Sequence, residues 1–245
     1  QINAKKSRDH TEQLLRSLKY PIKVNKMNNI DKITINGLSQ FKSFNHIIPG
    51  DISSAAFFIV LVILSNKSEM IIKNVNVNES RIGIIKILNR MGATIKLKNK
   101  KIYRGENTAN IFIKSSRKLK GINCPSYLNS SAIDEFLIIF LVAAKAKGIS
   151  TFKNLGELNK KESPRLDIAL KFLKMIGIKV KRNKDNIKIF GNPKLEVTKN
   201  IYIKGYLKDH RVFMMACIAA LSFGGNWKIE DKDSVNTSFP FFLNI

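Results

Sequence analysis

Cysteine, histidine and long apolar runs are scarce in this sequence. The two cysteines, Cys124 and Cys217, lack the spacing of metal ligands and fit buried free thiols in a reducing compartment. The three histidines, His10, His46 and His210, are also spaced too irregularly for a metal site. We therefore expect no bound metal.

The apolar runs are too short for a membrane protein. The longest, residues 55–64 and 136–144, fall well short of the roughly 20 residues that span a bilayer. We find no signal-peptide pattern, no glycine-rich phosphate loop and no nucleophile elbow. No stretch is rich enough in proline, glycine or serine to predict long disorder. The sequence therefore predicts a folded cytoplasmic protein without a membrane segment.

Acidic residues are also few. Lysine and arginine number 43 against 18 aspartates and glutamates, which gives a formal net charge of +25. Three interpretations are open: a nucleic-acid-binding module, an enzyme whose field attracts anionic substrates, or a drift of composition toward Lys, Asn and Ile on solvated faces. The densest basic run, residues 96–101, is predicted to lie at a hairpin turn. It is not aligned along one helix face, as a patch that reads a nucleic-acid groove would be.

The most informative pattern is internal repetition. Residues 71–95 predict a strand, a polar loop, an amphipathic helix and a second strand, and residues 151–180 repeat this order roughly 80–85 residues later. Gly92 and Gly177 stand where each amphipathic helix would be capped. Each unit also has an earlier helix that is apolar on nearly every side, which predicts burial. These buried helices are predicted over residues 54–64, 135–146 and 212–221.

The repeats predict an α/β (α+β) fold of three βαβαββ-like units over residues 47–245. Residues 1–46 match only the back half of such a unit, with a helix near 14–18 and strands at 20–24 and 32–36. A repeat cannot bury its apolar face without its partner elements. We therefore expect residues 1–46 to be the end of another domain, most of which lies outside this chain.

Polar clusters stand at the predicted helix starts, at residues 49–54, 132–135, 159–165 and 208–211. Helix N-termini offer free N–H groups and a positive dipole end, which favour anions. If the units pack with their buried helices parallel, these N-termini meet on one face.

Each cluster also has a structural interpretation. Asp51, Ser53 and Ser54 fit ordinary N-cap chemistry. Asp134 fits either a cap or a base whose pKa is raised at the mouth of a buried helix.

The later clusters are richer in charge. Ser163 suits the N-cap of the amphipathic helix, and Pro164 suits its first position. The charged side chains of Lys161, Glu162 and Arg165 could then project into a cleft. Residues 209–211 suggest an anion clamp at another helix start.

Seven short segments occur in the order seen in EPSP synthases, and the chain resembles that family along essentially its whole length. The segments are residues 7–12, 49–56, 90–93, 133–135, 161–165, 209–211 and 237–240. The first and last of them resemble the bacterial subgroup that includes glyphosate-tolerant enzymes.

This resemblance implies a fold of two similar domains of the enolpyruvyl transferase inverse-barrel type, with the active site between them. Residues 1–46 would end the N-terminal domain, and residues 47–245 would form nearly all of the C-terminal one. The implied reaction transfers the enolpyruvyl group of phosphoenolpyruvate to the 5-hydroxyl of shikimate 3-phosphate and releases phosphate, without a metal or other cofactor. We expect this chain alone to be inactive, and the full-length protein to be a monomer.

The resemblance also implies roles for single residues. Asp134 would accept a proton and hold the shikimate hydroxyls, and Glu162 would share in proton transfer at the enolpyruvyl carbon. The implied shikimate 3-phosphate contacts are Ser7, Arg8, Asp134 and Lys161, and the implied phosphoenolpyruvate contacts are Arg165 and Arg211. Two anionic substrates call for this cationic charge, and proton transfer calls for carboxylates with separated pKa values.

Three positions depart from the family pattern. The family usually has Arg where Asn159 stands and Asp where Pro164 stands, and many members have Lys in place of Thr237. The loss of that Arg removes a positive charge beside the substrate loop. A second candidate in the same superfamily is the enolpyruvyl transferase that acts on UDP-N-acetylglucosamine, but residues 161–163 and 209–211 favour the first.

Overall fold

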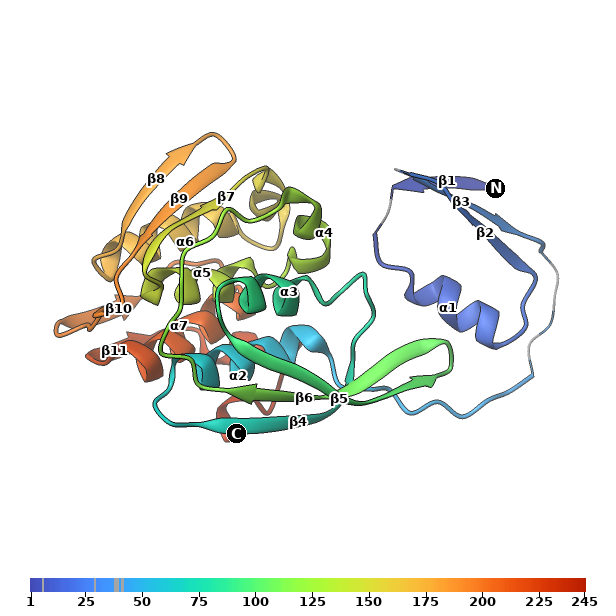
Figure 1. Ribbon diagram of the computed structural model, residues 1–245, viewed down its shortest axis with the longest axis horizontal. Helices are drawn as coiled ribbons and strands as arrows, with labels where there is room; N and C mark the ends of the chain where they lie inside the picture. The colour runs from blue at the N-terminus through green and yellow to red at the C-terminus, as the bar shows by residue number, and fades with distance from the viewer. Residues whose placement is uncertain (6, 29, 38–39, 41) are drawn as a thin grey trace.

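A computed structural model describes residues 1–5, 7–28, 30–37, 40 and 42–245 (Figure 1). A small module at the N-terminus lies beside a larger body. The module consists of strands β1 (Ile2–Lys5), β2 (Ile22–Lys26) and β3 (Ile30–Ile35) and helix α1 (His10–Ser17).

The body contains the remaining described helices and strands. Its helices are α2 (Ile52–Leu64), α3 (Gly83–Arg90), α4 (Asn129–Ala132), α5 (Phe136–Lys145), α6 (Arg165–Met175) and α7 (His210–Phe223). Its strands are β4 (Glu69–Asn76), β5 (Thr94–Tyr103), β6 (Glu106–Lys114), β7 (Gly148–Phe152), β8 (Lys179–Asn183), β9 (Asn186–Gly191), β10 (Asn200–Ile203) and β11 (Asn226–Ile229).

The sheets confirm the repeat that the sequence predicts. Three antiparallel sheets share one strand order: β1–β3–β2, β4–β6–β5 and β7–β9–β8. In each sheet the strand that comes last along the chain lies in the middle, so the N-terminal module repeats the back half of the two complete units. The third unit of the body contributes the parallel pair β10–β11. In the other two units the expected opening strand is reduced to isolated parallel bridges, at Gly50–Val75 in the first and at Lys120–Lys147 and Asn123–Thr151 in the second.

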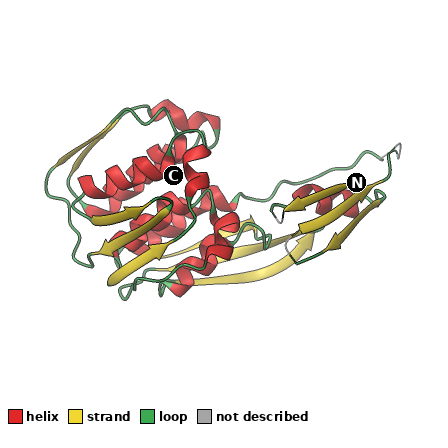
Figure 2. Ribbon diagram, turned by 90° about the horizontal axis from the view of Figure 1, so that it is seen from above, coloured by secondary structure: helices red, strands yellow, loops and turns green. Residues whose placement is uncertain are grey.

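The core of the body is a group of three helices, α2, α5 and α7, which pack against one another. Figure 2 shows the helices gathered in the body with strands at its edges. Every residue of α5 from Phe136 to Ala144 is buried, as its uniformly apolar sequence predicts. Gly92 and Gly177 adopt positive φ angles of 91° and 85° after α3 and α6, which confirms them as C-terminal caps. Among the described residues, no helix is both long and apolar enough to cross a membrane.

The basic run at residues 96–101 does not form a hairpin turn, so that prediction is wrong. The run lies inside β5, and the turn falls at Arg104 and Gly105, whose φ angles are 51° and 80°. Positive φ at both central residues suits the two-residue turns that match strand twist. Lysines are accommodated in the strand because their stems lie on the sheet surface, where the ammonium of Lys98 stands 4.4 Å from the centre of the Phe112 ring.

The N-terminal module has no core of its own. Among the described side chains of residues 1–51, none is buried, although α1 and its sheet carry apolar residues. The position of the module relative to the body therefore depends on individual contacts rather than on a shared apolar core.

We expect the three-helix core to dominate the stability of the body. Phe140 is fully buried, and its ring centre lies 5.9 Å from that of Phe136 and 5.2 Å from that of Phe152. Phe140→Ala should lower the free energy of unfolding by about 3–5 kcal/mol, because it leaves a cavity. Phe241 is 69% exposed, and Phe241→Ala should cost less than about 0.5 kcal/mol. Urea titrations followed by fluorescence measure both, and equal losses would contradict this account of the core.

Candidate active site

The starts of four helices meet on one side of the body. Asp51 caps α2 by accepting a hydrogen bond of 3.0 Å from the N–H of Ser54, and Asp209 caps α7 by accepting one of 2.9 Å from the N–H of Arg211. Side chains then cross between the helix starts. Ser53 at the start of α2 donates to Glu135 at the start of α5. The predicted convergence of helix N-termini is therefore confirmed.

Asp134, in the turn between α4 and α5, lies at the centre of this region. Its carboxylate forms an ion pair with Arg8 and lies 3.5 Å from Nζ of Lys161 and 3.6 Å from Nη1 of Arg165. Arg211 donates a hydrogen bond of 3.2 Å to the backbone oxygen of Asp134. Four cations from three segments of the chain thus surround one carboxylate.

These cations decide the protonation of Asp134. Burial alone raises the pKa of its carboxyl, but the positive charges of Arg211, Arg8 and Lys161 outweigh burial and lower that pKa to about 2. The pKa of the adjacent Glu135 is raised instead, because this side chain is almost completely buried. The sequence-based prediction of a raised pKa at Asp134 is therefore wrong. The pKa values of the neighbouring carboxyls Asp134 and Glu135 are thus shifted in opposite directions.

Arg165 is the most buried cation of the site, with 1% of its side chain exposed. Its guanidinium donates to both carboxylate oxygens of Asp209, over 2.8 and 3.2 Å, and it also pairs with Glu162 over 2.6 Å. The buried hydroxyl of Ser163 donates to Asp209 over 2.8 Å. Burial raises the pKa of Asp209, but the guanidinium of Arg165 more than offsets this and holds it below its usual value.

Asp209 caps α7 and neutralises Arg165, so Arg211 is the residue of the 209–211 segment that stays a candidate for binding an anion. One local prediction is wrong. Ser163 is not the N-cap of α6, since its hydroxyl is used by Asp209, and Pro164 stands at the N-cap position instead of the first helical position.

Asn159 supplies the missing cap. Its side-chain oxygen accepts hydrogen bonds from the N–H groups of Leu166 and Asp167, over 2.9 and 3.3 Å. The residue that stands where the family usually has Arg therefore stabilises the first turn of α6, where it satisfies two N–H groups that lack partners within the helix.

The other predicted site residues lie nearby but differ in exposure. Lys161 and Arg211 are half-buried, and Glu162 is exposed at the edge of the cluster, held by Arg165. Ser7 and Arg8 are exposed between β1 and α1, and only Arg8 has a described contact with Asp134. Thr237 stands apart, and its hydroxyl donates to the backbone of Ser234.

Sequence reasoning missed a series of polar contacts that connects Arg81 to the starts of α2 and α5. Arg81 donates to Ser53 over 2.7 Å and pairs with Asp51 over 3.2 Å, and Ser53 in turn donates to Glu135. The repeat could have revealed this role, because Arg81 and Arg165 occupy corresponding positions of the two units, next to the start of the amphipathic helix. Each of these arginines lies close to the acidic residue that precedes the next buried helix.

The family model for EPSP synthase (3-phosphoshikimate 1-carboxyvinyltransferase) matches residues 2–245. This chain belongs to the EPSP synthase family. It is 41% identical over 239 residues to the 3-phosphoshikimate 1-carboxyvinyltransferase of Ruthia magnifica subsp. Calyptogena magnifica, a match that covers 98% of this chain and 53% of the relative. It is 39% identical over 244 residues to the enzyme of the same name from Thermodesulfovibrio yellowstonii, covering 98% and 54%.

Solved structures agree with this family assignment. The EPSP synthase of Acinetobacter baumannii superposes with a TM-score of 0.87 at 35% identity, over 98% of this chain and 54% of that one. The enolpyruvyl transferase NikO from Streptomyces tendae superposes with a TM-score of 0.70 at 13% identity, which shows the shared fold alone. The predicted family and fold class are confirmed, whereas the likeness to a glyphosate-tolerant subgroup stays a prediction. The chain spans about half the length of the curated relatives it matches.

The lowered pKa of Asp134 predicts a pH-dependent contribution to stability. Ionised Asp134 stabilises the fold at any pH above its unfolded pKa of about 3.9, and this contribution is lost as the pH falls through the folded pKa of about 2. Asp134→Asn should therefore lower the free energy of unfolding by on the order of 2 kcal/mol at pH 7. The difference in the free energy of unfolding between the wild type and Asp134→Asn should disappear as the pH falls from about 4 to about 2.

The exposed Asp233 provides the matched control. Asp233→Asn makes the same chemical change and should alter the free energy of unfolding by less than about 0.5 kcal/mol at each pH. Denaturant titrations at a series of pH values measure these differences. If the loss of unfolding free energy in Asp134→Asn does not depend on pH, ionised Asp134 does not stabilise the fold through the surrounding cations.

Proposed function

We propose that this chain supplies one wall of the active site of a 3-phosphoshikimate 1-carboxyvinyltransferase. The proposed reaction joins the enolpyruvyl group of phosphoenolpyruvate to the 5-hydroxyl of shikimate 3-phosphate and releases phosphate. One observation carries the proposal: four cationic side chains from three segments surround an ionised aspartate at the meeting point of buried helix starts. Such a site suits two highly anionic substrates that carry hydroxyl groups.

Shikimate 3-phosphate would lie on the side of the cluster formed by Ser7, Arg8 and Lys161. Arg8 and Lys161 carry charges that can bind a phosphate, and both already face an anion in the form of Asp134. The ionised Asp134 would accept hydrogen bonds from the sugar hydroxyls. A phosphate that takes over part of the charge of Arg8 and Lys161 would also raise the pKa of Asp134. Substrate binding would then make this carboxylate a better acceptor for the proton of the 5-hydroxyl.

Phosphoenolpyruvate would lie on the side of Arg211 and Arg165. Arg211 is half-buried and reaches the backbone of Asp134, so its position is fixed before any ligand arrives. Arg165 is held by Asp209 and carries Glu162 on its outer side. Glu162 is exposed and would exchange a proton with the enolpyruvyl carbon. The positive field and the two carboxylates therefore come from this chain's own side chains.

The relatives are about twice as long as this chain, so the proposal concerns only part of a longer enzyme. Residues 1–46 would end the first domain of the full-length enzyme, and residues 47–245 would form most of its second domain. The other half of the relatives would supply the opposite wall, so that this chain alone does not turn over substrate. A monomeric cytoplasmic enzyme fits this proposal, and the free thiols of Cys124 and Cys217 support a reducing compartment.

The test joins this chain to the half of the Acinetobacter baumannii EPSP synthase that the match does not cover. We expect the fusion to form product from shikimate 3-phosphate and phosphoenolpyruvate, and the unfused chain to form none. Lys161→Met in the fusion should raise KM for shikimate 3-phosphate roughly 10–100-fold, because a charged hydrogen bond to phosphate is lost. The exposed neighbour Lys160 gives the control Lys160→Met, which should leave KM unchanged.

Two results would contradict the proposal. Turnover by the unfused chain would show that its own residues complete the site. A folded fusion that is inactive with shikimate 3-phosphate, or that accepts UDP-N-acetylglucosamine in its place, would exclude the proposed reaction. If the fusion does not fold, calorimetric titration of the unfused chain with shikimate 3-phosphate provides the test. The unfused chain carries this half of the site and should still bind the ligand.

A further inference from the structure

Arg8 reaches Asp134 from a module that has no core of its own. It lies between β1 and α1, and the module packs on the body without any buried side chain among its described residues. An ion pair between two side chains does not by itself fix the orientation of a helix and a sheet. Other contacts must hold the start of α1, and the two residues that follow Arg8 make them.

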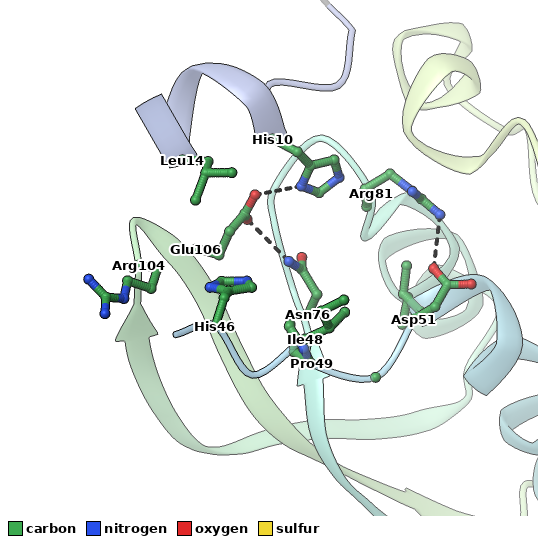
Figure 3. A pocket seen from close by; sticks show the side chains of 12 residues that line it. His10, Leu14, His46, Ile48, Pro49, Asp51, Asn76, Arg81, Arg104 and Glu106 are labelled. Carbon is green, nitrogen blue, oxygen red and sulfur yellow. Dashed lines mark hydrogen bonds and ion pairs between the residues drawn. The ribbon is translucent and has the colours of Figure 1, made fainter. Parts of the chain in front are cut away.

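Asp9 and His10 both contact buried polar residues of the body. Asn78, which is 6% exposed, donates from its side-chain nitrogen to Asp9 over 2.8 Å and to Glu106 over 3.1 Å. Glu106, which is 8% exposed, lies 2.5 Å from Nδ1 of His10 and accepts a further bond of 3.2 Å from Asn76. Figure 3 shows Glu106 between His10 and Asn76. One amide and one carboxylate therefore connect the start of α1 to β4 and β6.

Asn78 is itself held in place. Its side-chain oxygen accepts two hydrogen bonds of 2.8 Å from Ser80, one from the N–H group and one from the hydroxyl. The amide is therefore oriented with its nitrogen toward Asp9 and Glu106. It acts as the donor between two carboxylates that would otherwise repel each other.

The hairpin β5–β6 supports α1 from a second side. It extends from the body to the N-terminal module, as Figures 1 and 2 show. At its turn, a Cβ atom added to Gly105 would lie 2.6 Å from the backbone oxygen of Gln13 in α1. Next to this contact is a cavity of about 270 Å³ lined by His10, Glu106 and other residues. Apolar side chains such as Leu14 and Ile48 line this cavity but do not fill it, so the polar contacts determine how α1 is placed.

We propose that Asn78 and Glu106 are positioning residues for the binding of shikimate 3-phosphate. They fix Asp9 and His10, and through these two residues they hold the preceding Arg8 beside Asp134. This inference rests on the proposed function, since it assigns Arg8 to the shikimate 3-phosphate side of the site. Neither residue touches the cluster around Asp134, so both act through the placement of the N-terminal module.

The decisive variant is Asn78→Asp in the fusion protein. It keeps the size of the side chain and the oxygen that accepts from Ser80, but it replaces the donor with a carboxylate oxygen that faces Asp9 and Glu106. We expect KM for shikimate 3-phosphate to rise roughly 10–100-fold, because Arg8 is displaced. KM for phosphoenolpyruvate should stay within about twofold, because Arg165 and Arg211 are held by contacts within the body.

One further variant serves as a matched control, and a second replaces Glu106 conservatively so that its hydrogen bonds are kept. Asn107 is exposed and adjacent to Glu106 on β6, so Asn107→Asp adds the same charge nearby and should leave both KM values unchanged. Glu106→Gln should also retain near-normal KM values. Its amide oxygen can accept from Asn78 and its amide nitrogen can donate to the ring of a neutral His10.

The outcomes separate this inference from the proposed function. An inactive wild-type fusion would count against the proposed function. An active one in which Asn78→Asp leaves KM for shikimate 3-phosphate unchanged, or raises both KM values equally, would overturn the inference alone. Hydrogen exchange at the α1 amides of the unfused chain tests the anchoring without catalysis. Protection should fall in Asn78→Asp and persist in Asn107→Asp, and unchanged protection in both variants would refute it.

Discussion

One carboxylate, that of Asp134, allows the cations of this site to lie close together. Arg8, Lys161, Arg165 and Arg211 come from the N-terminal module, the loop before α6, α6 itself and α7, and all four lie around the turn before α5. Like charges at such distances repel strongly in a partly buried region, and Asp134 offsets this repulsion. Asp209 does the same for Arg165 on the buried side. The site is therefore organised before any substrate is present, which is the arrangement that stabilises developing charge most effectively.

The rest of the fold brings these charged side chains together. The buried helices α2, α5 and α7 bring their N-termini together, and the loops at those ends carry the charged side chains. Most of the net charge of +25 has no part in this, because many lysines lie on solvated strand surfaces, as Lys98 does beside Phe112. Net charge alone therefore does not identify the function. The proposed function rests instead on the small group of cations around the carboxylate of Asp134.

Much of the fold could be predicted from the sequence, because repeats and periodicity are local signals. The buried helices, the glycine caps and the partial unit at the N-terminus follow directly from such patterns. The partners of single side chains could not be predicted in this way. The partner of Asp209, for example, is Arg165, which lies 44 residues away in the chain and gives no local signal beside residues 209–211. The raised pKa belongs to Glu135 rather than Asp134 because the burial of Glu135 outweighs the hydrogen bond that it accepts from Ser53, 82 residues away.

The most direct test is a crystal structure of this chain with shikimate 3-phosphate bound. The account predicts the phosphate group against Arg8 and Lys161, with a ring hydroxyl on the carboxylate of Asp134 and the ion pairs of that carboxylate weakened. A ligand bound instead at another basic surface, for example between Lys145 and Lys147, with the cluster around Asp134 unchanged, would contradict it.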